Sequence, residues 1–367
     1  MQLLNLSTLS NMDLLRPFRV RRAFFTGLLH IALVTIVIGA FMTHFFGEQG
    51  EIHLRSDKAL SLSASSKTVS LFLWDFQIIS DAENNPVDFV SELRMIDRNR
   101  QPVQIDEGTV RMNKPLKYHG WRFCQSDYDS DGQGVVLSYN YDPWGIGITY
   151  TGYALLLVSM IGFFFQRNTY FRSLLRKQHT WLMVGLGVFV IGMAVVMTKV
   201  VTPQPPLQPV LQTPLLGIHV SVIMPAYTLF AVMMIDGILG LCIPAKRESL
   251  MHLSQLLLYP ALFCLTAGIF IGAVWANMSW GRYWGWDPKE TWALITMLVY
   301  ALPVHWPVVS RKSKVESQKS KVESRKSKIE SRKQAIYFHI CTIVAFLFVL
   351  FTYFGVNRLP GGLHSYA

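Results

Sequence analysis

Long apolar stretches constrain this chain more than any other feature of its sequence. Of its 367 residues, 51% are hydrophobic and only 16% are charged, which is too apolar for a single soluble domain. An α-helix needs about 20 apolar residues to cross the hydrocarbon of a lipid bilayer. We therefore predict a multi-span α-helical membrane protein with about seven transmembrane helices. The apolar windows lie at residues 24–46, 144–166, 180–200, 219–243, 254–275, 291–309 and 336–357.

Basic residues gather in alternate connections between these windows, and this pattern predicts membrane topology. The formal net charge is +11, but the bases lie between spans rather than on a folded basic face, so nucleic acid is not an expected partner. The positive-inside rule places the N-terminus in the cytoplasm and the C-terminus outside. The first three basic segments include Arg16, Arg19, Arg21, Arg22, Arg167, Arg172, Arg176, Lys177, Lys246 and Arg247.

The first apolar window and the cysteines restrict the processing and the thiol chemistry that we expect. A signal-peptide core has about 7–15 apolar residues, and the first window is longer, so we favour a retained span over a cleaved signal peptide. Of the four cysteines, only Cys124 falls outside the predicted spans. Because the chain has no Cys-x-x-Cys pair, thiol exchange is expected of a partner rather than of this protein.

Residues 47–142 form the one sizeable segment between predicted spans. They hold 15 of the 23 acidic residues and 10 basic residues, a net charge of −5 that favours a solvated domain. Alternating runs at 69–79 and 135–141, with turn signals at 85–86 and 131–132, are typical of strands. We expect one small β-rich domain on the outer, periplasmic side of the membrane.

A heptad repeat of basic character lies within residues 310–335, in the last basic connection. Its period invites a coiled-coil interpretation, but one apolar residue per repeat is too few for a coiled-coil seam. A solvated insert attracted to anionic lipid is the favoured interpretation. A partner-binding helix remains the alternative.

The stretch from Trp275 to Trp292, which we call the tryptophan segment, is the clearest candidate for a binding site. It places five tryptophans and a tyrosine within 18 residues. An interfacial aromatic belt is the alternative, although belts usually hold fewer tryptophans. Indole faces can stack on a flat apolar ligand while Arg282 or Lys289 meets carboxylates at its edge. Haem has this shape and these propionates.

Asp287, Pro288 and Glu290 within this segment have a simpler structural interpretation. An Asp at the N-cap, a Pro at the first helical position and a Glu three residues after the cap form a capping box. We expect it to begin the sixth span and to fix the loop that precedes it. No catalytic acid or base is therefore assigned in this segment.

Four of the ten histidines lie at depths that suit axial ligation of haem iron. His30 and His305 fall near the cytoplasmic ends of the first and sixth windows, and His219 and His364 fall near the outer ends of the fourth and seventh. Proton relay or interhelical hydrogen bonding is the alternative for any single histidine. Two pairs at two depths favour a route for haem from the cytoplasmic side to the outer face.

From Trp280 to Trp292 the sequence WGRYWGWDPKETW resembles the WWD signature of the CcsA (ResC) haem-handling family of System II cytochrome c biogenesis. The resemblance extends over about 180–367. The N-terminal part resembles the closing portion of ResB (CcsB), notably at 113–123 and 141–146. The whole is similar to a shortened ResB–CcsA fusion, with a ResB-like part at 1–166 and a CcsA-like WWD domain at 167–367.

This resemblance implies how the candidate residues act. Outer histidines that flank the WWD signature ligate haem in the family and map onto His219 and His364, while the membrane pair maps onto His30 and His305. Haem, of b-type, is then a transient substrate that is delivered to the outer face and joined to the Cys-x-x-Cys-His thiols of apocytochrome c. The remaining haem-binding candidates are Trp280, Trp284, Trp286, Trp292, Arg282 and Lys289.

The resemblance also implies partners, a location and a reaction class. Thioredoxin-like reductants keep the apocytochrome thiols reduced, and a bacterial cytoplasmic (inner) membrane with a periplasmic active face is the expected setting. The activity would be that of a holocytochrome c synthase, or haem lyase, forming thioether bonds. A bis-histidine electron-transfer cytochrome and a haem exporter without ligation activity are the alternatives.

Three departures from the family pattern bear on these expectations. ResB usually brings more spans and a larger outer domain, so a separate ResB-type subunit is an expected further partner. The heptad insert lengthens the connection between His305 and His364. Cys124 stands where the family usually has an aromatic residue.

Overall fold

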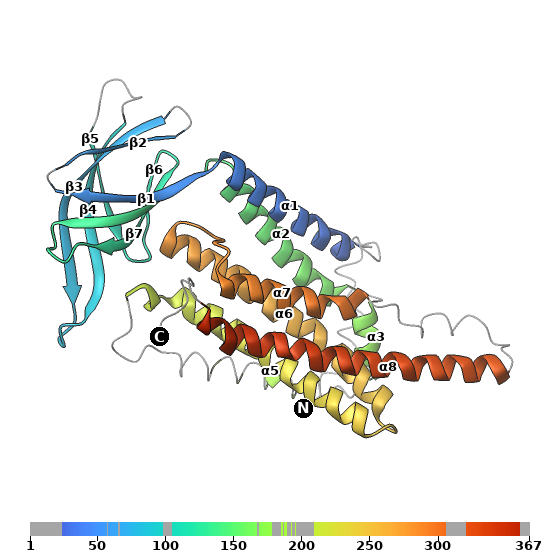
Figure 1. Cartoon of the computed structure of the whole chain (residues 1–367). Helices are drawn as coiled ribbons and strands as arrows, with labels where there is room; N and C mark the ends of the chain where they lie inside the picture. The colour runs from blue at the N-terminus through green and yellow to red at the C-terminus, as the bar shows by residue number, and fades with distance from the viewer. Residues whose placement is uncertain are drawn as a thin grey trace, which may run out of the picture.

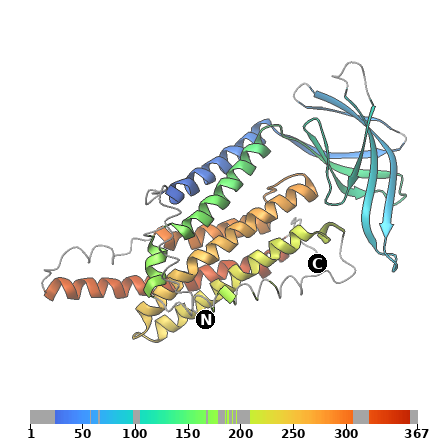
Figure 2. The ribbon, with the colours of Figure 1, turned by 180° about the vertical axis from the view of Figure 1, so that it is seen from behind.

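A computed structural model describes residues 24–56, 58–64, 67–97, 105–166, 169–177, 209–305 and 321–359, and residues 185, 187, 188, 192 and 195. Two parts are visible, a β domain at one end and a set of long helices that runs away from it (Figures 1 and 2). The β domain is inserted between the first two helices of the chain.

Five helices within the described ranges are long and apolar enough to cross a membrane. They include the first helix α1, the pair α5 and α6, and the last helix α8, and each overlaps a predicted span. The fifth candidate runs from Gly145 to Leu175 and contains α2. The helix bounds are α1 Phe24–Phe46, α2 Gly145–Phe165, α3 Tyr170–Lys177, α5 Pro214–Cys242, α6 Arg247–Trp280, α7 Pro288–His305 and α8 Lys321–Leu350.

The other two predicted spans do not correspond to any of these five candidates. Helix α7 covers most of the predicted span at 291–309 but carries Lys289 and Glu290 in its first turn, and it is not among the five candidates. The predicted span at 180–200 lies almost entirely outside the described residues. The described chain thus has a multi-pass helical architecture, and the number seven stays a prediction.

Helices α1 and α2 form an antiparallel pair because small residues let their backbones approach closely. Gly39 of α1 lies against Thr149, and Gly145 at the start of α2 lies against Thr43, so that a Cβ atom at either glycine would clash. The far end of α2 reaches the start of α1, where Gly162 lies against Phe25. The β domain therefore sits at one end of this pair, and the start of α1 lies at the other.

Helices α5, α6, α7 and α8 share a second apolar core. Phe230 of α5 stacks on Tyr300 of α7 with ring centroids 3.7 Å apart, and both side chains are fully buried. Aromatic contacts such as Tyr153 with Phe270 join α2 to α6. The two helical groups are thereby packed side by side.

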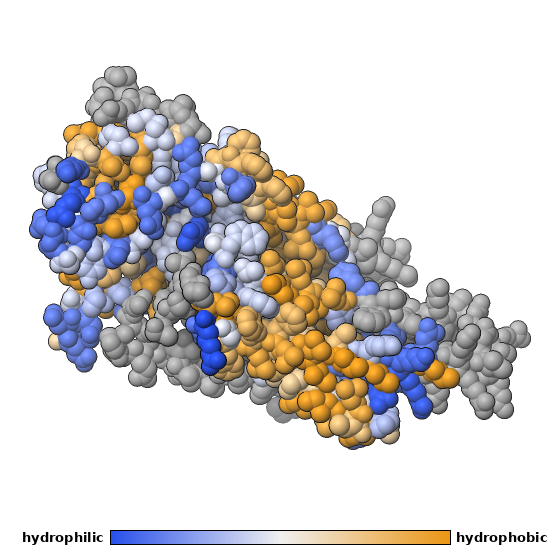
Figure 3. Space-filling view, viewed as in Figure 1, coloured by the Kyte–Doolittle hydropathy of each residue, from blue (hydrophilic) through white to orange (hydrophobic). Residues whose placement is uncertain are grey.

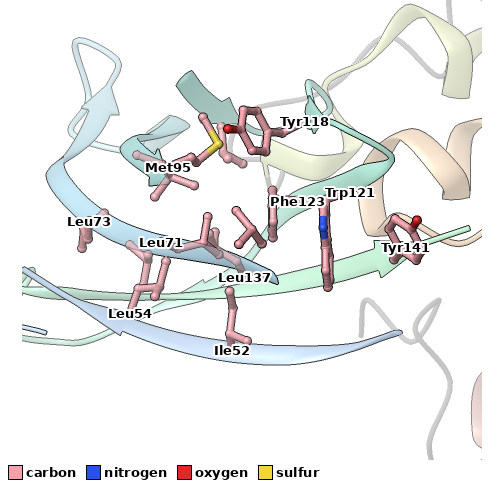
Figure 4. Packing of buried hydrophobic residues seen from close by; sticks show 14 of the residues in the cluster. Ile52, Leu54, Leu71, Leu73, Met95, Tyr118, Trp121, Phe123, Leu137 and Tyr141 are labelled. Atoms are coloured by element: carbon pink, nitrogen blue, oxygen red, sulfur yellow. The ribbon is translucent and has the colours of Figure 1, made fainter. Parts of the chain in front are cut away.

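The β domain is a sandwich of two four-stranded antiparallel sheets, which confirms the small β-rich region predicted at 47–142. One sheet has the order β1-β8-β7-β6 and the other β2-β3-β4-β5. Apolar side chains of both sheets meet between them, as expected for strands with one buried face (Figure 4). The strands are β1 Glu48–Arg55, β2 Leu60–Ala64, β3 Lys67–Ser80, β4 Pro86–Asp97, β5 Ile105–Arg111, β6 Leu116–Tyr118, β7 Trp121–Tyr128 and β8 Gly134–Tyr141.

Surface hydropathy follows the same division. Apolar residues dominate the visible face of the helices, whereas hydrophilic residues cover much of the β domain (Figure 3). Many large apolar side chains of α1 are exposed, among them Ile31, Val34 and Phe41, each at 57%. A helix of this kind is suited to lipid rather than to water.

The second half of the basic insert is helical and continuous with the last span. Helix α8 begins at Lys321 and continues into the apolar stretch that ends at Leu350, followed by a π turn at Phe351–Gly355. The first half of the insert lies outside the described residues. The helix extends beyond the bundle at the end opposite to the β domain (Figure 1).

Candidate functional site

The tryptophan segment joins the end of α6 to the start of α7 on the side of the β domain (Figure 1). Helix α6 ends at Trp280, and Gly281 terminates it with φ 75°, a left-handed conformation that glycine adopts without strain. A Cβ atom at Gly281 would also lie 3.1 Å from Sγ of Cys124 on β7. This glycine therefore permits both the turn and the close approach of the β domain.

The predicted capping box is present at the start of α7. A carboxylate oxygen of Asp287 accepts a hydrogen bond from the backbone N–H of Lys289 at 2.8 Å. Oε2 of Glu290 accepts from the N–H groups of Asp287 at 3.3 Å and of Gly285 at 2.8 Å. Both carboxylates thus hold the loop against the helix, which confirms the structural role predicted for them.

The tryptophans lie on the end of α6, in the loop and on α7. Trp275 and Trp280 meet edge to face at 4.9 Å at the end of α6, and Trp284 and Trp286 do so at 5.8 Å within the loop. Trp292 lies on α7 and contacts Phe351 beyond the end of α8 at 4.3 Å. The segment therefore presents indole rings at three places.

Trp286 differs from the other tryptophans in two respects. Its side chain is 73% exposed, and its φ of 55° lies in the left-handed region, which is unusual for a bulky residue. Backbone strain of this kind persists only where the surroundings enforce it, and it often accompanies function. Here the capping box directly after Trp286 supplies that constraint.

The two cations of the segment face different neighbours. Arg282 lines a pocket between the loop and the β domain, and its side chain lies against Gly285. Nζ of Lys289 donates to Oδ1 of Asn357, after α8, at 3.3 Å. Both side chains are half-buried.

His219 lies in the second turn of α5, near the same end of the bundle. Its Nδ1 is 2.8 Å from the carbonyl oxygen of Gly268 on α6, so the ring donates through Nδ1. Gly272 makes room for the ring, because a Cβ atom there would lie 2.8 Å from Cε1 and Nδ1 of the imidazole. A histidine whose Nδ1 is held by a backbone carbonyl has the tautomer and orientation that metal ligation through Nε2 requires.

His30 and His305 are brought together at the opposite end of the helices. Their ring centroids are 6.4 Å apart with an interplanar angle of 84°. Nδ1 of each ring is hydrogen bonded to the carbonyl oxygen four residues earlier, Thr26 at 2.7 Å and Ala301 at 3.0 Å. Each Nε2 therefore points away from its own helix.

The separation of this histidine pair can be compared with what a shared iron needs. Imidazole nitrogens about 2 Å from a metal on its two sides place the ring centroids about 6–6.5 Å apart. The observed 6.4 Å falls within this range without any movement of either helix. By centroid distance the pair is compatible with one iron between the two rings.

The last predicted ligand cannot be placed. His364 lies outside the described residues, so the expected pairing of His219 with His364 stays a prediction. The end of α8 does lie beside the tryptophan segment, as the contact of Lys289 with Asn357 shows.

A polar network between the two helical groups was not predicted from the sequence. The hydroxyl of Tyr283, in the tryptophan segment, lies 2.7 Å from Oγ1 of Thr43 on α1 and 3.3 Å from Oγ1 of Thr149 on α2. Thr43 also donates to the carboxylate of Asp142 at 2.6 Å. Tyr283 stands within the WWD signature, but no pattern in the sequence identifies its partners far along the chain.

A second set of contacts holds the β domain against the end of α6. Nη1 of Arg122 donates to Oδ1 of Asn277 at 2.7 Å, and Oγ of Ser138 donates to the carbonyl oxygen of Trp280 at 3.3 Å. Oγ of Ser279 donates to Oδ1 of Asn113 at 2.6 Å. The β domain and the tryptophan segment therefore form one contiguous surface.

Comparison with known families agrees with this arrangement. Residues 147–322 match the family model described as Cytochrome C assembly protein, and residues 21–152 match the ResB-like family. The fold is that of a multi-pass membrane protein, and over these residues the chain is similar to proteins of cytochrome c assembly. More particularly, the chain joins a ResB-like portion to a cytochrome c assembly portion, as in a ResB–CcsA fusion, which confirms the predicted resemblance.

The chain is also similar to individual proteins over part of its length. Over 172 residues the chain is 35% identical to Protein NrfI of Wolinella succinogenes, covering 44% of this chain and 17% of that protein. It is 36% identical over 172 residues to Cytochrome c biogenesis protein CcsA of Chlamydomonas reinhardtii, covering 44% and 43%. The protein of that name from Lotus japonicus is 45% identical over 102 residues, covering 28% and 25%. The aligned parts span less than half of each relative.

Proposed function

We propose that this protein carries haem from the cytoplasmic side of a bacterial inner membrane to its periplasmic face and attaches it to apocytochrome c. The observation that carries the proposal is the pairing of His30 with His305, whose ring centroids are 6.4 Å apart at the end of the bundle away from the β domain. The location of the tryptophan segment and His219 at the other end supports two stations for haem. In the proposed topology the chain crosses the membrane seven times, with its N-terminus inside and its C-terminus outside.

In this proposal His30 and His305 hold haem within the membrane, and His219 and His364 hold it at the outer face. Trp280, Trp284, Trp286 and Trp292 contact the porphyrin, and Arg282 and Lys289 lie where propionates would be bound. Haem is the substrate. The protein supplies orientation, because no side chain of the segment is assigned as an acid or a base.

The chemistry at the outer face is an addition to the vinyl groups of haem. Each apocytochrome thiol adds S–H across one C=C bond, which forms one C–S bond and one C–H bond without a net change of oxidation state. Holding thiol and vinyl groups in a near-attack arrangement supplies much of the rate of such a reaction. Thioredoxin-like reductants keep the thiols reduced, and a ResB-type subunit is a further proposed partner.

The test is coexpression with a reporter apocytochrome in cells that lack their own maturation system. Covalent haem on the reporter is the expected result, and its absence would overturn the proposal of ligation. His30→Ala and His305→Ala are expected to remove a haem absorption signal from the purified protein. If the His219→Ala and His364→Ala variants both matured the reporter as well as the wild type, with an unchanged haem spectrum, the proposal that these histidines hold haem at the outer face would be refuted.

The same preparation separates the competing functions. An electron-transfer cytochrome keeps its haem, whereas the proposed synthase passes haem to a Cys-x-x-Cys-His peptide and forms a thioether. Release of haem outside the membrane without thioether formation would identify an exporter. Mass spectrometry of the peptide distinguishes these outcomes.

A further inference from the structure

The last long helix ends in a π turn beside the tryptophan segment. Helix α8 is α-helical as far as Leu350, and the backbone N–H of Val356 then bonds to the carbonyl oxygen of Phe351, five residues earlier. Such a turn contains one residue more than an α-helical turn, is rare, and occurs frequently at functional sites. Its contacts with α7 show what the extra residue achieves here.

The extra residue brings two side chains five positions apart to the same neighbour. In an α-helix, five residues turn the chain by about 500°, which leaves the fifth side chain about 140° away from the first. Across the π turn, Oγ1 of Thr352 lies 3.3 Å from the carbonyl oxygen of Trp292, and Oδ1 of Asn357 accepts a hydrogen bond from Nζ of Lys289 at 3.3 Å. Lys289 and Trp292 are three residues apart and therefore share one face of α7. The π turn is thus matched to this face of the tryptophan segment.

Two buried threonines join the backbones at this contact. Thr296 on α7 is 0% exposed and Thr352 is 1% exposed, and their hydroxyl oxygens are 3.0 Å apart. Oγ1 of Thr296 donates to the carbonyl oxygen of Trp292 at 2.8 Å, so both hydroxyls lie beside the same carbonyl group. Hydrogen bonds of this kind hold membrane helices together. Thr352 therefore ties the backbone of Trp292 to the π turn.

The indole ring of Trp292 is held by the same turn. Its ring centroid is 4.3 Å from that of Phe351 and 6.1 Å from that of Phe348. A Cβ atom at Gly355 would lie 2.6 Å from Cδ2 of Phe351, so the absence of a side chain at Gly355 leaves room for the phenyl ring. Trp292 is only half-buried, so part of its surface stays accessible. The π turn thus contacts both the backbone and the side chain of this tryptophan.

We propose that the π turn at Phe351–Gly355 is a positioning element of the outer haem station, and that Thr352 is a positioning residue that acts through Trp292. This proposal rests on the proposed function, in which Trp292 contacts the porphyrin. Thr352 does not touch haem in this arrangement, because its hydroxyl is used within the protein; it sets the place and orientation of the indole. His364, a proposed ligand at the same station, follows Gly355 by nine residues in the sequence.

Binding of ferric haem to the outer station alone tests this role. The parent protein is the full chain with His30→Ala and His305→Ala, purified in nanodiscs, so that the inner histidine pair cannot take up the probe. Hemin, the ferric form of haem, is titrated into the parent and its variants, and absorbance gives the affinity. Electron paramagnetic resonance of the bound ferric iron reports the axial ligands and their geometry.

The first variants change one hydroxyl. Thr352→Val removes it with little change of shape, whereas Thr352→Ser retains it. We expect Thr352→Val to weaken hemin binding about two- to tenfold, the effect of one hydrogen bond, and to alter the resonance spectrum. Thr352→Ser should bind hemin as the parent does.

Thr342→Val is the matched control. Thr342 is 1% exposed on the same helix, and its hydroxyl donates to the carbonyl oxygen of His339 at 2.9 Å. The substitution therefore removes a comparable buried hydrogen bond about 15 Å farther along the helix. It should lower thermal stability about as much as Thr352→Val and leave the hemin affinity and the resonance spectrum unchanged.

A deletion tests the spacing itself. Phe354 is 63% exposed, and its deletion takes one residue out of the turn, so that an α-helical continuation would direct Asn357 away from α7. Phe354→Ala keeps the spacing and removes only the exposed ring. We expect the deletion to weaken hemin binding more than Thr352→Val does, and Phe354→Ala to bind as the parent does.

The outcomes separate this proposal from the proposed function. If the parent binds no hemin, the outer station is wrong and the positioning role is overturned with it. If the parent binds hemin but Thr352→Val leaves the affinity and the spectrum unchanged, or Thr342→Val changes them equally, the positioning role is overturned and the outer station stands. A Thr352→Val variant that loses only thermal stability also overturns the proposal, since the turn would then serve packing alone.

Discussion

Removing the hydroxyl of Tyr283 should weaken the attachment of the tryptophan segment to α1 and α2. The side chain is 7% exposed, and its oxygen lies 2.7 Å from Thr43 and 3.3 Å from Thr149, which is itself 1% exposed. In Tyr283→Phe, Thr43 keeps Asp142 as a partner, but Thr149 loses its bond to Tyr283. We expect the free energy of unfolding to fall by about 1–2 kcal/mol, the range for one lost bond with a buried group left unpaired.

Tyr300→Phe is the matched control for this prediction. Tyr300 is fully buried in the helical core, and its hydroxyl has no hydrogen-bond partner within the described residues. Removing that hydroxyl is expected to be neutral or slightly stabilising, since no bond is lost. Denaturant unfolding of the two variants in detergent micelles measures the difference.

A double-mutant cycle locates the effect. Tyr283→Phe and Thr43→Val should show a coupling of about 0.5–1.5 kcal/mol, because the two side chains share one hydrogen bond. A coupling near zero, or equal destabilisation by Tyr283→Phe and Tyr300→Phe, would refute the reasoning. In that event the hydrogen bonds of Tyr283 would not contribute to the free energy of unfolding.

Three further predictions concern the tryptophan segment and the residues near it. Gly272→Ala should displace the ring of His219, lower stability by about 1–3 kcal/mol and alter the haem spectrum of the proposed outer site. Gly217→Ala is the control, because nothing lies within 4 Å of a Cβ atom there, and it should have none of these effects. Glu290→Gln should retain reporter maturation and lose about 1 kcal/mol of stability, because the amide oxygen still accepts from the loop N–H groups; loss of maturation in a folded variant would instead indicate an acid or base role. Burial raises the pKa of the Cys124 thiol to about 12, so roughly one molecule in 10⁴ carries a thiolate at pH 8, and alkylation should be far slower than that of a model thiol. The thiol of the unfolded chain ionises at about pH 8.5. Because the folded protein keeps the thiol neutral, the free energy of unfolding should be unaffected by this group below that pH and should fall as the pH rises toward 12. A Cys124→Ser variant should lack this dependence.

The helical architecture was largely predictable because its signals are local. A window of apolar residues specifies a span, and Asp287, Pro288 and Glu290 specify a helix start within four residues of sequence. The capping box accordingly forms as expected. The ends of helices were less predictable, since α8 extends through half of the basic insert and α6 begins before its apolar window.

The approach of His30 to His305 was predictable for a different reason. His30 and His305 were placed by their depth in two spans of opposite direction, and depth is fixed by counting residues from the span ends. That the two helices face one another at this depth required the structure. The pairing of His219 with Gly272 follows from packing between helices, which sequence from one chain does not reveal.

Contacts between the β domain and the helices could not be predicted. Arg122 with Asn277, and Thr43 with Tyr283, join residues 155 and 240 positions apart. No local pattern marks such pairs, because either partner is an ordinary polar residue. The predicted aromatic platform was similarly a statement about composition, while the structure distributes its rings over the end of α6, the loop and α7.

Helix α1 is held near the end that adjoins the β domain and is otherwise in contact chiefly with α2. Only Ala32 and Gly39 of its 23 residues are buried. Thr43 is bonded to the tryptophan segment near one end, and His30 lies 13 residues away, which is about 20 Å along a helix. If Thr43 acts as a pivot, a tilt of about 3° displaces His30 by about 1 Å over that length. A separation of 6.4 Å between imidazoles is sensitive to movements of this size, so the angle of α1 against its neighbours sets the distance between the two rings.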